Sequence, residues 1–338
     1  MTMHIVLFGT LLTVLGALMQ GSFVAPMRLT SDWRWENIWL VYSFVGLLLF
    51  PVAVAAITVP QILSVYRFSS TGSLLSAGLF GCSWGFANVL FGLAVAAAGM
   101  SVSFSIVCGL SASLGAFLPL VVLTPQHLLQ PSGLIIVAGV MLALSGVSII
   151  GVAGHRRERE QSLVTNGRSM RKGILLAIAA GTLAPTLNFS YAFGQEIMQR
   201  AREQGATAMS QGDALWAVCL AGGFVSNAAY AAWKLARNRS WAGFIEGSRV
   251  RNWVLTALMG VLFTGGLLLY GRGATTLGTL GPVVGWPVFQ ATMVLTSTCL
   301  GLIAGEWKNA GSCVTAMLGA GLLVLIGAIL VLSLANNV

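Results

Sequence analysis

The sequence predicts an all-α integral membrane protein with ten transmembrane helices, arranged as two inverted repeats of five helices. The first observation behind this prediction is composition: 57% of the 338 residues are hydrophobic and 8% are charged, against roughly 25% charged residues in an average soluble domain. The second is that apolar runs of about 20 residues, the length that spans a bilayer, recur along the chain. The third is an internal echo, because three glycines in each half are separated by eleven and then seven residues, and an aromatic residue precedes the middle one. The two sets are Gly81, Gly92 and Gly99, and Gly260, Gly271 and Gly278.

Each predicted span is an apolar run bounded by polar or basic connections. The first run, from Ile5 to about Met27, follows no basic region and exceeds the roughly 7–15 apolar residues of a signal peptide, so it predicts a membrane helix. The connections after the third and eighth runs are short and contain glycine. The ten predicted helices cover residues 4–27, 37–58, 73–97, 101–122, 132–153, 173–195, 212–236, 252–271, 281–304 and 312–335.

Lysine and arginine are distributed unequally between the two sides of this arrangement. Fourteen of the 18 fall in connections on one side and four on the other, and the richer side is expected to be cytoplasmic. Ten spans then place both termini on the extracytoplasmic side of the cell inner membrane. The largest polar connection, residues 155–172, is basic and divides the chain into one five-helix repeat at residues 1–154 and another at residues 173–338. We interpret this connection as an orientation signal and a hinge, in preference to a binding site for anionic lipid.

Several functional classes lack the residues that they need. The net charge of +9 is spread over short connections, which is typical of membrane orientation and not of nucleic-acid binding. The nine acidic residues are not paired as the Mg²⁺ site of a membrane enzyme would require. The five cysteines form no CxxC pair, and no GxxxxGK[ST] phosphate-binding loop occurs. The sequence therefore predicts a protein that is not an enzyme and that uses neither a cofactor nor a metal.

The predicted spans carry neutral hydrogen-bonding side chains and aromatic rings where charges are absent. Trp84 and Asn88 lie one helical turn apart and share a face, and Trp286 and Gln290 repeat that spacing. An amide without a partner in hydrocarbon is costly, so these side chains should face protein, water or a ligand. Single amides often only join membrane helices, and tryptophans often only mark the interface. As a set they suit a neutral polyhydroxylated ligand, because amides and hydroxyls both donate and accept hydrogen bonds. The predicted substrate-binding residues are Gln20, Trp84, Asn88, Asn188, Tyr191, Asn227, Trp286 and Gln290.

Short motifs spread over the chain resemble those of the L-rhamnose–proton symporter family, within the drug/metabolite transporter superfamily. They are Ala25-Pro26, Trp33-Arg34-Trp35-Glu36 with Trp39, the WGFAN run from Trp84 to Asn88, Gly92-Leu93, Gly99-Met100-Ser101, and the run from Glu306 to Gly311. The resemblance covers nearly the whole chain. It implies a ten-helix carrier that imports L-rhamnose or a similar deoxy sugar with a proton, by alternating access between two inverted repeats. The implied partners are the sugar, the proton and the lipid bilayer.

Proton coupling would need a titrating group, and the carboxylates of the spans all lie near helix ends. The candidates are Glu36, Asp213 and Glu306; Glu36 also has a simpler interpretation as an interfacial carboxylate near Arg34. The alternatives to a symporter are an uncoupled facilitator, an exporter of another small metabolite and, less favoured, a membrane enzyme or a binding protein. The lack of a carboxylate at the centre of any predicted span would suit the facilitator.

Overall fold

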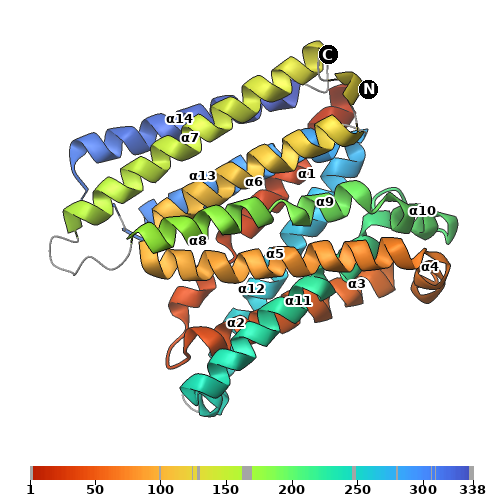
Figure 1. Ribbon diagram of the computed structural model, residues 1–338, viewed down its shortest axis with the longest axis horizontal. Coiled ribbons are helices and arrows are strands. Elements are labelled where there is room, and N and C mark those ends of the chain that lie inside the picture. The colour runs from red at the N-terminus through yellow and green to blue at the C-terminus, as the bar shows by residue number, and fades with distance from the viewer. Residues whose placement is uncertain are drawn as a thin grey trace.

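The computed structural model is built from helices throughout the residues that it describes (Figure 1). These residues are 3–98, 100–123, 125–127, 130–161, 170–245, 249–278, 281–305, 307–308 and 310–334. The long helices are α1 (Met3–Ser22), α5 (Thr71–Ala98), α6 (Met100–Leu123), α7 (Pro131–Gln161), α8 (Met170–Leu183), α11 (Gln211–Asn238), α12 (Arg249–Thr276), α13 (Gly281–Ile303) and α14 (Ser312–Leu334). The shorter elements are η1 (Ala25–Leu29), α2 (Trp35–Ser43), η2 (Phe44–Leu49), α3 (Phe50–Thr58), α4 (Ile62–Phe68), η3 (Pro125–His127), α9 (Thr186–Phe193), α10 (Gln195–Glu203) and η4 (Trp241–Phe244).

The predicted membrane class is confirmed by the length and composition of these helices. Within the described ranges, nine helical segments are long and apolar enough to cross a bilayer. The predicted span at 101–122 corresponds to α6, in which the shorter apolar stretch is Ile106–Val122. Large apolar side chains also cover much of the molecular surface, and Ile57 and Ile303 are more than 80% exposed. Such a surface requires a hydrocarbon environment.

Two spans are interrupted where proline removes a backbone donor. Pro185 lies between α8 and α9, so the α-helix of the span Lys172–Glu203 is interrupted near its middle. The other interrupted span is Trp35–Thr58, called the second span below because it is second in the chain. In it, the π-helix η2 lies just before Pro51. Proline cannot donate to the preceding turn and its ring crowds the carbonyl there. The carbonyl of Gly46 in η2 instead accepts a short hydrogen bond from the Thr264 hydroxyl of α12.

Glycines allow the helix backbones to approach closely at the points that the sequence echo marks. A methyl group added at Gly81 of α5 would overlap the carbonyl oxygen of Cys219 in α11. At Gly260 of α12, an added methyl carbon would lie 2.7 Å from the backbone nitrogen of Gly46. Small residues commonly mediate helix contacts in membranes, because lipid provides no hydrophobic drive for association. Figure 1 shows α5 and α11 packed side by side.

Replacing Gly81 by alanine is expected to destabilise the protein by about 2 kcal/mol, because the added methyl group forces α5 away from a backbone carbonyl that cannot rotate aside. The melting temperature of the detergent-purified protein measures the effect. Gly78→Ala is the matched control, since a methyl group at Gly78, one turn earlier on α5, would meet no atom within 4 Å. Equal melting temperatures for the two variants would show that the α5–α11 contact does not depend on Gly81.

Candidate functional site

A partly open cavity of about 90 Å³ lies between α1, α5, α6, α12, α13 and the junction of α8 with α9. Much of its wall is apolar, with Phe23 just after α1 and Phe263 of α12 joining apolar residues of α5, α6 and α9. The apolar lining residues are Phe23, Ala87, Phe91, Val107, Cys108, Ala184, Leu187, Phe263 and Met293.

The polar part of the wall includes five of the eight side chains that the sequence singles out. Trp84 and Asn88 come from α5, Trp286 and Gln290 come from α13, and Gln20 comes from α1. The two pairs share a spacing of four residues, which brings both members of each pair to the same helix face. The structure therefore joins two segments about 200 residues apart into one polar wall.

The amides of this wall keep hydrogen-bonding capacity open to the cavity. Asn88 donates from Nδ2 to Oδ1 of Asn227 at 3.0 Å, and its own carbonyl oxygen makes no further hydrogen bond within the described residues. The side-chain amides of Gln20 and Gln290 make no hydrogen bond within those residues either. Because an amide buried away from water is costly without partners, this wall is suited to a solute that supplies them.

The two indole rings of the wall are held in fixed orientations. Trp84 stacks on Phe263 with a centroid separation of 5.4 Å and an interplanar angle of 26°. Trp286 stacks on Phe289, and its Nε1 donates to the carbonyl oxygen of Ser111 at 3.0 Å. Such rings present rigid apolar faces to the cavity. Sequence reasoning missed Phe263 and Ser111, since a single phenylalanine or serine in an apolar helix carries no distinguishing signal.

Asn227 lies behind the cavity wall and positions Asn88. Its Oδ1 accepts hydrogen bonds from Asn88 and from Nε1 of Trp39 at 2.8 Å, and its Nδ2 donates to the carbonyl of Gly223 at 2.9 Å. The side chain is fully buried. It therefore joins the second span to α5 and α11 at the level of the cavity.

Asn188 and Tyr191, the remaining predicted side chains, belong to a packed aromatic layer beside the cavity. We define this layer by Asn188, Tyr191, Trp216 and Tyr270, each at most 2% exposed. Tyr191 stacks on Trp216 at 5.4 Å and donates to the carbonyl of Gly271 at 2.6 Å. Tyr270 donates to Oδ1 of Asn188 and packs edge-on against Trp286 on the cavity wall.

A second cavity lies on the other side of this layer. Tyr191 borders it together with Gln195, Arg202, Gln211 and Thr275. The aromatic layer thus lies between the central cavity, which Trp286 lines, and a more polar cavity at the ends of α10, α11 and α12.

The two acidic candidates in the described residues lie outside the central cavity, at opposite ends of the second span. Glu36 is 2% exposed, and its Oε1 accepts from Asn238 Nδ2 and Ser240 Oγ, both at 2.8 Å. Asp213 accepts from Thr58 Oγ1 at 2.8 Å. The third candidate, Glu306, lies outside the described residues.

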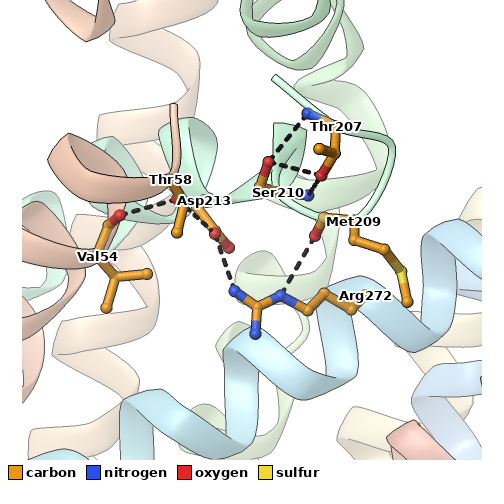
Figure 2. Close-up of polar contacts among 7 residues, drawn as sticks. All are labelled: Val54, Thr58, Thr207, Met209, Ser210, Asp213 and Arg272. Atoms are coloured by element: carbon orange, nitrogen blue, oxygen red, sulfur yellow. Dashed lines mark hydrogen bonds and ion pairs between the residues drawn. The ribbon is translucent and has the colours of Figure 1, made fainter. Parts of the chain in front are cut away.

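Asp213 also forms an ion pair that joins α11 to α12, as Figure 2 shows. Nη2 of Arg272 lies 3.1 Å from Oδ2 of Asp213, and Nε of Arg272 donates to the carbonyl of Met209 at 3.3 Å. Asp213 is 1% exposed, so its charge depends on Arg272 and Thr58 for compensation. Arg272 directly follows Gly271, which accepts from Tyr191, so the ion pair borders the aromatic layer.

Helical spans around a neutral, amide-lined and indole-lined cavity, as the described residues form them, fit the class of membrane transporters. The comparison with known families agrees: the model for the L-rhamnose-proton symport protein (RhaT) family matches residues 1–337. The chain belongs to this family, which consists of transporters and not of enzymes.

Named relatives match over nearly their whole length. The chain is 26% identical over 330 residues to the L-rhamnose-proton symporter of Klebsiella pneumoniae, covering 96% of each chain. It is 28% identical over 320 residues to that of Salmonella gallinarum, covering 93% of each. It is 27% identical over 338 residues to that of Cronobacter sakazakii, covering 97% of this chain and 98% of the relative.

Proposed function

We propose that this protein imports L-rhamnose, or a closely similar neutral deoxy sugar, together with a proton. The observation that carries the proposal is the central cavity, where three amide side chains and fixed indole faces meet in a chain of the L-rhamnose-proton symport protein family. The relatives that match over nearly their whole length are L-rhamnose-proton symporters. The bacterial relatives also favour the cell inner membrane as the location.

In this proposal, the amides bind the sugar hydroxyls and the rings cover its apolar side. Gln20, Asn88 and Gln290 supply donors and acceptors, while Trp84 and Trp286 supply flat faces. The apolar wall offers a place for the methyl group of a deoxy sugar. We assign Asn227 to positioning Asn88, and Asn188 and Tyr191 to closing the cavity on one side.

The proposed architecture remains ten spans in two inverted repeats of five, residues 1–154 and 173–338 joined by the basic connection 155–172. Helix pairing supports it: α1 packs on α12 and α13, and the equivalent span, α8 with α9, packs on α5 and α6. Likewise α5 packs on α11, and α12 packs on the second span. Moreover, α1 begins and α14 ends at the same end of the bundle, as an even number of crossings requires (Figure 1).

The glycine echo supports the same symmetry and indicates how access alternates. Gly92 on α5 faces Trp35 of the second span, and Gly271 on α12 faces Trp216 of α11, at equivalent positions of the two repeats. A methyl carbon at Gly271 would lie 2.5 Å from Trp216, whereas at Gly92 it would lie 3.5 Å from Trp35. Gly271 is correspondingly buried and Gly92 is partly exposed. The contact at the α12 end is thus the tighter of the two.

We infer that this conformation is closed at the aromatic layer and looser at the opposite end of the cavity. The distribution of Lys and Arg favours the extracytoplasmic side for the closed end and for both termini. Alternating access would exchange the two arrangements, with Phe91 and Gly92 closing on Trp35 while Tyr270 and Gly271 separate from Trp216. The proton would be carried by Glu36, Asp213 or Glu306.

Sugar counterflow in proteoliposomes tests the identity of the solute independently of proton coupling. Vesicles loaded with unlabelled L-rhamnose are expected to take up labelled L-rhamnose transiently, and loading with a charged sugar acid should support no uptake, because the cavity wall presents no compensating charge. Exchange of another solute in preference to L-rhamnose would reject the proposed substrate and favour a carrier of a different metabolite.

A further inference from the structure

One polar group on the wall of the central cavity is buried without a hydrogen-bond partner. Ser111 of α6 lines the cavity and is 0% exposed. Its Oγ makes no hydrogen bond within the described residues. Buried hydroxyls are nearly always hydrogen-bonded in folded proteins, because losing water without a replacement costs free energy. An exception on the wall of the central cavity needs an explanation.

The local helix geometry does not satisfy this hydroxyl. A serine within a helix can donate to the carbonyl four residues earlier, and Ser113, two residues further on, does so with Gly109 at 2.9 Å. Ser111 makes no such bond. Its own carbonyl is occupied by Nε1 of Trp286, which fixes this turn of α6 against α13. The backbone that carries Ser111 is therefore anchored to one of the predicted sugar-binding residues.

The neighbours of Ser111 show that its helix face belongs to the cavity. Val107 and Cys108 precede it by four and three residues and line the same space. Trp84 and Gln290 line it from α5 and α13. Ser111 thus belongs to the wall formed by α6, with its hydroxyl buried there, and α6 otherwise contributes only apolar lining among these residues.

We propose that Ser111 is a direct substrate contact whose hydroxyl is left unpartnered until a sugar hydroxyl binds to it. The inference rests on the proposed function, since it requires a polyhydroxylated solute in the central cavity. A hydroxyl can donate to and accept from the sugar at once. Ser111 then complements the amides of Gln20, Asn88 and Gln290, and it bonds to one particular hydroxyl of the sugar.

The test compares Ser111→Ala with Ser103→Ala in the purified full-length protein. Ser103 lies on the same helix, is also 0% exposed and unpartnered within the described residues, and does not line the cavity. Both substitutions should leave the melting temperature equal or higher, because each removes an unsatisfied hydroxyl. L-rhamnose affinity, measured by calorimetry, should fall about tenfold in Ser111→Ala, the value of one lost hydrogen bond, and should stay unchanged in Ser103→Ala.

The affinities for a panel of monodeoxy L-rhamnose analogues distinguish a direct contact from a structural role of Ser111, because a structural role would not single out one sugar hydroxyl. The analogue that lacks the hydroxyl bound by Ser111 should bind the wild-type protein more weakly than L-rhamnose does. The Ser111→Ala protein should bind this analogue and L-rhamnose with equal affinity. Unchanged affinity in Ser111→Ala, or an equal loss in Ser103→Ala, would reject the contact while leaving the proposed function intact. Failure of the wild-type protein to bind L-rhamnose would reject the proposed function and, with it, this contact.

Discussion

L-rhamnose uptake is expected to fall about a hundredfold when Asn88 is replaced by alanine, while the amount of folded protein stays near normal. The substitution removes the amide that projects into the cavity from α5 and also deprives Oδ1 of Asn227 of one of its two donors. Two lost hydrogen bonds of about 1.4 kcal/mol each correspond to a hundredfold change. Uptake of labelled L-rhamnose into proteoliposomes at matched protein content measures the effect.

Cys82→Ala is a suitable control for this prediction. Cys82 lies on the same helix six residues earlier, is partly buried and does not line the central cavity. Its replacement should leave uptake unchanged. If Asn88→Ala transports L-rhamnose as fast as the Cys82→Ala protein does, the polar wall of α5 does not bind the sugar.

The second large effect is expected for Arg272→Gln, which should lower the stability of the protein on the order of 3 kcal/mol and abolish most L-rhamnose counterflow. The substitution leaves the Asp213 carboxylate 1% exposed without its positive partner. The substituted residue also directly follows Gly271, whose carbonyl accepts a hydrogen bond from the Tyr191 hydroxyl in the aromatic layer. Melting temperature and counterflow are measured on the same preparation.

The double variant Asp213→Asn with Arg272→Gln provides the control, because it removes both charges together. Replacing a buried pair by neutral groups costs much less than removing one partner, so the double variant should regain a large part of the stability lost in Arg272→Gln. A double variant no more stable than the single one would show that Arg272 does not stabilise the protein by compensating Asp213.

The spans were predictable from the sequence because each is a long apolar run, and the bilayer permits few other structures for such runs. The polar wall was partly predictable for a similarly local reason, since the four-residue spacing of Trp84 and Asn88, and of Trp286 and Gln290, places each pair on one helix face. The glycine echo indicated two related halves. Its physical role, close contact between α5 and α11 and between α12 and the second span, required the three-dimensional structure.

The hydrogen-bond partners of Asn227 and Asn188 could not be predicted from the sequence. Both are amides in apolar runs, as Asn88 is, but their partners are distant in sequence: Asn227 bonds to Trp39, and Asn188 bonds to Gly115 and Tyr270. Sequence spacing fixes the face of a helix but not which other helix covers that face. The ion pair of Asp213 with Arg272 joins two helix ends 59 residues apart and was hidden for the same reason.

Accumulation of labelled L-rhamnose in proteoliposomes under an imposed inward proton gradient tests the central claim most directly. Proton-coupled import predicts that the internal sugar rises above its external concentration and that a protonophore collapses the excess. Equilibration at the same rate with and without the gradient would contradict the coupling and identify the protein as a facilitator of the same sugar.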